Sequence, residues 1–181
     1  MIAHARLGLL ALVGALTLGS TACRMTAPGS APAPLAAGDT IRGVVSITGS
    51  DPLSVLVVVP RRGDAVVPTG ADVAQLRTLT GVEVTLAGAL TDECLPEGGP
   101  RGARVFAVTQ FAVRAMNGVS AVDGTLQQDG EVWILATSDG RRIPIVGLPQ
   151  ALANQAGARV YFVGSLDKAP QAYGIIKAAP R

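Results

Sequence analysis

The heptapeptides VTLAGAL, residues 84–90, and VYFVGSL, residues 160–166, share a strand-like pattern that ends in Gly-x-Leu. When the comparison is extended towards the N-terminus, a shift of 76 residues aligns Val55–Leu90 with Glu131–Leu166 without a gap. The six identical positions are glycine, proline or apolar, which are the residue types that turns and cores constrain most strongly. A match at constrained positions predicts two copies of one structural unit.

Both copies are expected to contain the same elements in the same order. Apolar, β-branched runs flank Gly-Asp at residues 63–64 and Asp-Gly at residues 139–140, which predicts a two-residue hairpin in each copy. Short helical patterns follow over residues 71–81 and 148–157, and each leads into an alternating strand. A further strand precedes each hairpin and another ends each copy, so the order is β-β-β-α-β-β.

This order resembles the OB-fold, a Greek-key barrel of five strands with a helix between the third and fourth. The resemblance covers the chain after Gly38. It implies a mostly β protein with two tandem OB-like five-stranded barrels, at 39–117 and 118–181, each with one short helix. The nearest groups are periplasmic bacterial OB-fold proteins and tandem OB-fold lipoproteins. A single β-sandwich that contains the strands of both copies is the alternative.

The N-terminus has the features of an export signal. A positive segment with Arg6 precedes the apolar stretch Leu7–Leu18, and small residues follow, so we expect a signal peptide over residues 1–22. The sequence STAC resembles the lipobox of bacterial lipoproteins, which implies that Cys23 is lipidated and anchors the protein to a membrane of the cell envelope, facing the periplasm or the exterior. Residues 23–38 are rich in Ala and Pro and are expected to form a disordered tether. Cleavage by an ordinary signal peptidase would instead give a soluble secreted protein.

The composition restricts the chemistry of the exported chain. The only histidine of the sequence, His4, lies in the expected signal peptide, so the exported chain would contain none. Ser-His-Asp triads, Cys-His pairs and His-ligated metal sites are therefore excluded. The sequence contains no Gly-rich phosphate loop. The formal net charge is only +2, and basic and aromatic residues do not recur at matching places in the two copies. Nucleic acid is therefore not an expected partner.

The largest difference between the copies is the loop TDECLPEGGPRGA, residues 91–103, where the second copy has the shorter DKAPQ. A long loop on a rigid barrel is a typical place for a ligand or partner to bind. Its spacing of acidic residues fits no EF-hand, so we expect no metal site and no cofactor. Cys94 has no adjacent basic residue to activate its thiol, and a disulfide with Cys23 requires that Cys23 carry no lipid. The candidate binding residues of this loop are Asp92, Glu93, Cys94, Glu97 and Arg101.

A second set of candidates lies on the hairpin strands of the second copy. Trp133, Arg141 and Arg142 would flank the face that binds oligonucleotides or oligosaccharides in OB-folds, although a lone Trp among apolar neighbours is more typical of a core. We expect a non-catalytic binding or interaction module of the cell envelope, without catalytic residues, whose partner is a protein, a glycan or a small ligand bound by the long loop of the first copy or by a barrel face. The alternative is an enzyme that uses carboxylates or a thiol between the two copies.

Overall fold

The computed structural model describes residues 38–180, and this part of the chain is mostly β, as predicted. The expected signal peptide, Cys23 and nearly all of the tether lie outside the described residues. Strands and short helices follow one another in the predicted order. In chain order the elements are β1 (Asp39–Thr48), β2 (Val55–Pro60), β3 (Val66–Thr69), α1 (Val73–Arg77), β4 (Val82–Thr91), β5 (Arg104–Met116), β6 (Val119–Asp129), β7 (Val132–Ala136), β8 (Arg142–Pro144), the 3-10 helix η1 (Gln150–Leu152), β9 (Arg159–Val163) and β10 (Ala172–Lys177).

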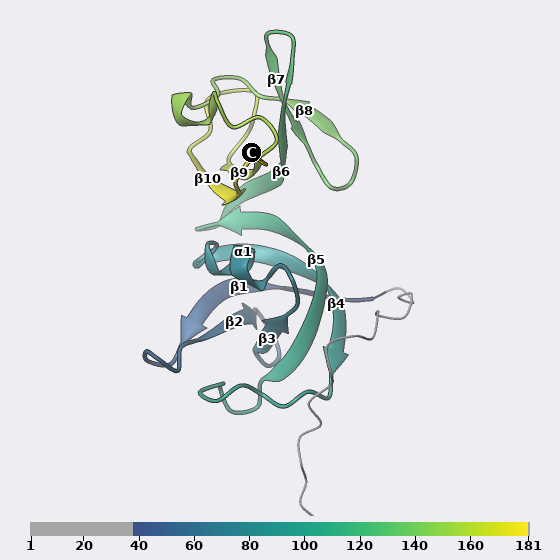
Figure 1. Cartoon of the computed structure of the whole chain (residues 1–181), viewed down its shortest axis with the longest axis vertical. Helices are drawn as coiled ribbons and strands as arrows, with labels where there is room; N and C mark the ends of the chain where they lie inside the picture. The colour runs from purple at the N-terminus through teal and green to yellow at the C-terminus, as the bar shows by residue number, and fades with distance from the viewer. Residues whose placement is uncertain (1–37, 181) are drawn as a thin grey trace, which may run out of the picture.

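The first five strands form a closed circuit of hydrogen-bonded pairs, the lower lobe in Figure 1. β1 pairs with β2 on one side and with β4 on the other, and β2 pairs with β3. β5 closes the circuit because it pairs with β4 in antiparallel fashion and with β3 in parallel. The helix α1 falls between β3 and β4 along the chain, where the sequence predicts it.

The last five strands repeat this pairing except at one seam. β6 pairs with β7 and β9, β7 pairs with β8, and β9 pairs with β10. In the described chain β8 and β10 form no ladder, and the Val146 N–H, just after β8, instead donates to the carbonyl of Leu166 in the loop between β9 and β10, at 2.9 Å. Tyr173 and Ile175 of β10 are consequently exposed, whereas Phe111 of the matching strand β5 is buried.

The strand pairs also correct the register of the repeat. Val45 lies opposite Val58 in the first copy, and Leu126 lies opposite Leu135 in the second, so the hairpin strands match at a shift of 77 rather than 76. A slip of one residue moves each side chain to the other face of a strand. Trp133 therefore matches a core position of β2, and its side chain packs against the core of the second copy.

The predicted hairpins and helices also differ in length from the structure. Five residues, 61–65 and 137–141, separate the hairpin strands, so the predicted two-residue turns are wrong. At the shift of 77, Gly63 matches Gly140, and both have positive φ angles, 92° and 84°, which glycine adopts without strain. The helices are shorter than the sequence predicts, since α1 has five residues and η1 has three.

A tight hairpin joins the two copies. Asn117 and Gly118 have φ angles of 51° and 80°, the left-handed pair of a type I′ turn. The expected boundary after residue 117 falls inside this turn. Only two residue pairs, Ala115 with Ser120 and Met116 with Val119, connect β5 to β6 before the strands separate. The copies are therefore joined directly, strand to strand.

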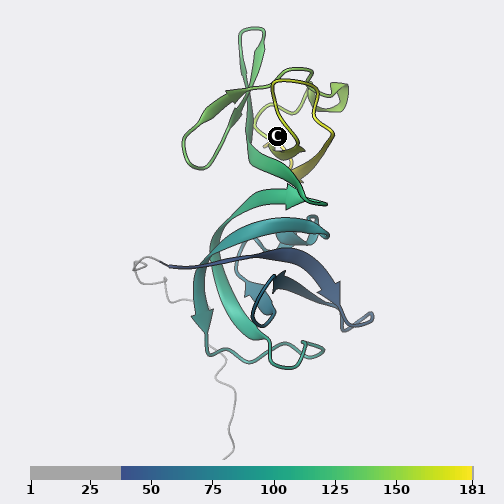
Figure 2. The same ribbon diagram turned by 180° about the vertical axis from the view of Figure 1, so that it is seen from behind.

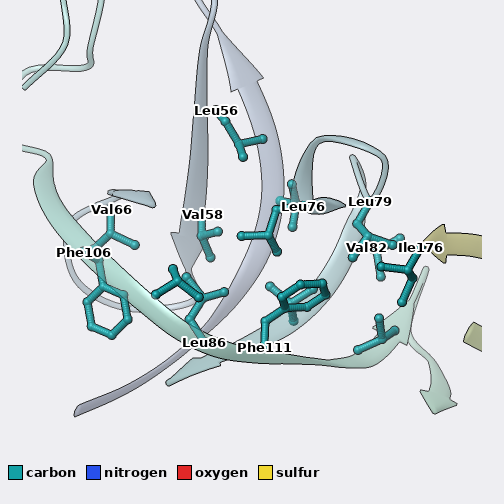
Figure 3. Close-up of a cluster of buried hydrophobic side chains, with 14 residues drawn as sticks. Leu56, Val58, Val66, Leu76, Leu79, Val82, Leu86, Phe106, Phe111 and Ile176 are labelled. Carbon is teal, nitrogen blue, oxygen red and sulfur yellow. The ribbon is translucent and has the colours of Figure 1, made fainter. Parts of the chain in front are cut away.

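Each copy has its own cluster of buried apolar side chains, whereas the single-sandwich alternative would have one core between two sheets. The larger cluster fills the first barrel around Phe106 and Phe111 (Figure 3). Ile176 of β10 belongs to this first cluster and lies beside Leu79 and Val82. The outer face of β10 thus packs against the first barrel and adds a hydrophobic contact to the covalent hairpin.

Candidate functional site

A groove of about 350 Å³ opens at the junction, where β5 and β6 separate beyond their hairpin. Ala112 of β5, Ala121 of β6 and Gly164 after β9 are among its lining residues, and their small side chains leave the space open. The loop between β7 and β8 contributes Thr137, Ser138, Asp139 and Arg141 to the wall. Side chains of both copies therefore form a single concave surface of the size that small ligands occupy.

A largely buried ion pair connects the copies beside this groove, and Asp123 of the pair belongs to the groove lining. The Arg159 guanidinium donates to Asp123 Oδ2 from Nε at 2.9 Å and from Nη2 at 2.6 Å. Arg159 Nη2 also donates to the Phe111 carbonyl at 2.6 Å, and the guanidinium lies 4.1 Å from the centroid of the Phe111 ring. The backbone N–H of Val113 donates to Asp123 Oδ1 at 2.7 Å. The side chains of β6 and β9 thus satisfy backbone groups of β5 that the short ladder leaves unpaired.

The same ion pair occurs in the first copy with the charges exchanged. Gly43 lies opposite Val84 in β1 and β4, and Gly124 lies opposite Val160 in β6 and β9. In each copy the ionised residues directly precede these glycines and valines. Arg42 and Glu83 of the first copy, 3.0 Å apart, occupy the positions of Asp123 and Arg159.

The first-copy pair is more open to solvent. The Arg42 side chain is 58% exposed, against 22% for Arg159. Arg61 approaches the same Glu83 carboxylate at 3.5 Å, so this carboxylate has two cationic neighbours. The second-copy pair is the more buried one and the one that contacts the other copy, through the Phe111 carbonyl.

Polar side chains at the rim of the groove are held by one another. Asp139 accepts a very short hydrogen bond from the Thr137 hydroxyl and one of 2.8 Å from Arg141 Nε. The hydrogen bond from Thr137 is the main cause that holds the pKa of the Asp139 carboxyl below its ordinary value; desolvation opposes it, and the hydrogen bonds and charge of Arg141 lower the pKa further. Across the groove, Arg114 Nε donates to Thr85 Oγ1 at 3.0 Å.

Of the candidates on the hairpin strands, only Arg141 lines the groove. Arg142 points elsewhere and bonds Gln127 Oε1 at 3.0 Å and Asp129 Oδ2 at 3.3 Å. Trp133 is half-buried against the second core, as the structural reading of the sequence indicated. Neither residue belongs to the junction site.

The loop candidates lie elsewhere, at the end of the first barrel remote from the second copy (Figures 1 and 2). The loop folds back over the outer face of β2 and β3, and its Leu95 and Ala103 pack against Val55, Val57 and Val67. It therefore covers the outer face of β2 and β3. The charged candidates on it are exposed and do not meet those of the second copy; they are Asp92, Glu93, Glu97 and Arg101.

Cys94 of this loop is disulfide-bonded. The only other cysteine in the sequence is Cys23, which lies outside the described residues. A thiol joined to lipid cannot also form a disulfide, so a lipidated Cys23 and a disulfide from Cys23 to Cys94 exclude each other.

Sequence reasoning did not identify Arg114, Asp123 or Arg159. A signal for the ion pair was present, because opposite charges precede the matched glycine and valine in each copy, and Val84 and Val160 already match at the shift of 76 residues. What the repeat comparison did not supply is that the strands carrying these charges lie side by side, β1 with β4 and β6 with β9. Asn117-Gly118 between two strands was a direct hairpin signal that the repeat comparison did not use.

Across residues 38–180, no three His, Cys, Asp or Glu side chains are close enough together to hold a metal ion. None of the helices in this range is long and apolar enough to cross a membrane. Comparison with protein-family models, with curated proteins and with solved structures found no match.

Proposed function

We propose that this protein is an exported, non-catalytic binding module of the cell envelope, built from two OB-like copies, which holds a small ligand in the groove at their junction. The element order and the closed circuit of the first copy support the OB-like description. The groove carries the proposal, because it is concave, combines polar and apolar walls, and is formed by both copies.

The carboxylates at the junction support binding rather than acid–base catalysis. Both oxygens of Asp123 already accept hydrogen bonds, and Asp139 is held by Thr137 and Arg141. The enzyme alternative requires the carboxylates or the thiol of residues 92–97 between the copies, whereas that loop packs over β2 and β3. A catalytic role for those residues would need a substrate at the opposite end of the first barrel (Figure 1).

The groove is tested by filling it. In the variant Ala112→Trp a large side chain projects from the outer face of β5 into the groove, and Gln110→Trp places the same side chain on an exposed position two residues away. Each protein is incubated with solubilised envelope extract and washed, and the molecules it retains are identified by mass spectrometry. We expect a specific small molecule on the native protein and on the Gln110 variant, and its loss from the Ala112 variant. Equal retention by both variants would show that the groove is not the site.

We further propose that a lipid on Cys23 tethers the module to the membrane, facing the periplasm or the exterior, in which case the disulfide of Cys94 is made with another molecule and not with Cys23. The anchor and a disulfide from Cys23 to Cys94 require the same sulfur atom, so intact mass before and after reduction separates them. A mature chain that begins at Cys23 and carries the added mass of lipid supports the anchor. An unmodified chain that gains two hydrogens on reduction indicates the soluble, disulfide-bonded secreted form.

A further inference from the structure

We propose that the junction groove recognises an anionic group, a carboxylate or a phosphate, on a small hydroxyl-bearing molecule, and that Arg114 and Arg141 bind this group. The inference rests on the proposed function, since it assigns a ligand class to the same groove. The observation behind it is that, within the described chain, each of these two guanidinium groups is hydrogen-bonded at Nε and not at its two outer nitrogens.

Both side chains are fixed through Nε and keep their outer nitrogens available. Arg114 Nε bonds Thr85 Oγ1 at 3.0 Å, and Arg141 Nε bonds Asp139 Oδ2 at 2.8 Å. Within residues 38–180 no acceptor bonds Nη1 or Nη2 of either side chain. A guanidinium fixed at Nε presents two parallel N–H donors with little remaining freedom, and this fork matches a carboxylate or phosphate.

Other arginines near the junction have already used these donors. Arg159 donates Nη2 to Asp123 and to the Phe111 carbonyl, and Arg142 donates both Nη atoms to neighbouring side chains. Neither has the free fork that a ligand needs. Arg114 and Arg141 combine this fork with a position on the wall of the groove.

The charge balance of the groove also favours an anion. Arg114 and Arg141 face one solvent-accessible carboxylate, Asp139, because Asp123 is buried and paired with Arg159. One positive charge is therefore uncompensated at the rim. A bound carboxylate or phosphate would balance it with charge-assisted hydrogen bonds.

The rest of the lining indicates the body of the ligand. Val122, Ile143 and Leu166 provide apolar surface, and the Ser138 hydroxyl has no hydrogen-bond partner among residues 38–180. A compact molecule with both hydroxyl groups and carbon faces fits such a wall. Acidic monosaccharide derivatives have this combination.

Three probes with one common body test the ligand class: glucuronate, glucose 6-phosphate and glucose. Binding of each to the mature protein is measured by isothermal titration calorimetry at low ionic strength. We expect at least one acid to bind ten-fold or more tightly than glucose, and the comparison of the two acids shows whether carboxylate or phosphate is preferred. The proposal is overturned if neither acid binds more tightly than glucose.

Substitutions then assign the binding to the two arginines. Arg114→Gln and Arg141→Gln should each weaken binding of the preferred acid by about ten-fold or more, since a hydrogen bond to a charged group contributes roughly 1.5–3 kcal/mol. Arg141→Lys keeps the charge but loses the fork, and should give an intermediate affinity. Arg62→Gln, an exposed position outside the groove, is the matched control and should bind as the native protein does.

Native-like affinity in both Arg114→Gln and Arg141→Gln would overturn the assignment. A neutral molecule retained from the envelope and lost in Ala112→Trp would refute only the anion inference and leave the groove as the site.

Discussion

Arg159→Met should destabilise the protein far more than the equivalent change in the first copy, Arg42→Met. Asp123, whose side chain is only 5% exposed, loses its cation and keeps one hydrogen bond, from the Val113 N–H. Removing one partner of a buried ion pair costs about 3–5 kcal/mol because the remaining charge stays buried without compensation. Since Arg159 is itself partly exposed, we take the lower end, about 3 kcal/mol.

The first-copy pair provides the matched comparison. Arg42 is mostly exposed, and Arg61 remains 3.5 Å from Glu83 after the substitution. Glu83 is itself largely buried, with 9% of its side chain exposed, but Arg42 is solvated and Arg61 still compensates the carboxylate after the substitution. Arg42→Met should therefore cost about 1 kcal/mol, close to the value of an exposed pair. The two substitutions are chemically identical, and the difference between them measures how burial changes the value of one ion pair.

Equilibrium urea unfolding followed by far-UV circular dichroism and by fluorescence of Trp133 tests this reasoning. Trp133 is the only tryptophan and reports on the second copy, whereas the dichroism reports on both. In the native protein the two signals should change together, and in Arg159→Met the fluorescence transition should come first, because the contact between the copies is weakened. A loss of about 3 kcal/mol corresponds to a melting temperature lower by roughly 6–12 °C. If Arg159→Met costs less than Arg42→Met, the buried pair does not hold the copies together.

Three further changes test other parts of the structure. Gly124→Ala should cost about 1–3 kcal/mol, measured by urea unfolding, because the added Cβ would lie 2.5 Å from a main-chain oxygen of β7; native-like stability would mean that β6 is not pressed this closely against it. Leu95→Ala should loosen the loop over β2 and β3 and accelerate tryptic cleavage after Arg101 several-fold, and an unchanged rate would show that Leu95 does not hold the loop down. Thr137→Val should raise the pKa of Asp139 towards its ordinary value, seen in the carboxyl carbon titration by NMR, because the hydroxyl is the main group that lowers it. The sign follows from the lowered folded pKa: the stabilisation from Asp139 is complete above the unfolded pKa and disappears as the pH falls through the folded one.

The strand order could be predicted from the sequence because alternation, turn residues and helix stops are local signals. The register of the hairpin strands could not be predicted in this way. The two copies differ in loop length, and the sequence alone does not show at which point along the chain the extra residues lie. A gap-free alignment put none of them within the matched stretch and so aligned Val57 with Trp133. Cross-strand pairing decides the question, because Val58 and Leu135 occupy the same rung next to β1 and β6. One residue of slip moves Trp133 from the position of Val57, on the outer face of β2, to that of Leu56 in the core.

The candidate site was harder to predict because a groove between two copies depends on how they pack. Arg141 was identified from its charge and its place beside the hairpin face that the OB-fold resemblance implies, and both follow from the order of elements along the chain. Arg114 and the pair of Asp123 with Arg159 acquire their roles from the separation of β5 and β6 after two rungs, which no local pattern encodes. The long loop was a reasonable candidate by length, but its apolar residues Leu95 and Ala103 explain its conformation as a cover over the first barrel.

A β-bulge occurs at the same place in the last strand of each copy, but the side chain at the bulge differs between the copies. In β5 the pairing with β4 skips Arg114, between Val113 and Ala115, and in β10 the pairing with β9 skips Ile176, between Ile175 and Lys177. The same β-bulge therefore occurs at the same place in each copy, and a bulge redirects the extra side chain away from its own ladder. Both redirected side chains reach the junction: Ile176 enters the core of the first barrel, and Arg114 lines the groove beside residues of the second copy. The bulge in β10 thus gives a hydrophobic contact between the copies, and the bulge in β5 places a charged side chain in the wall of the groove. The groove exists only where the two copies meet, so a single copy would not be expected to bind the ligand.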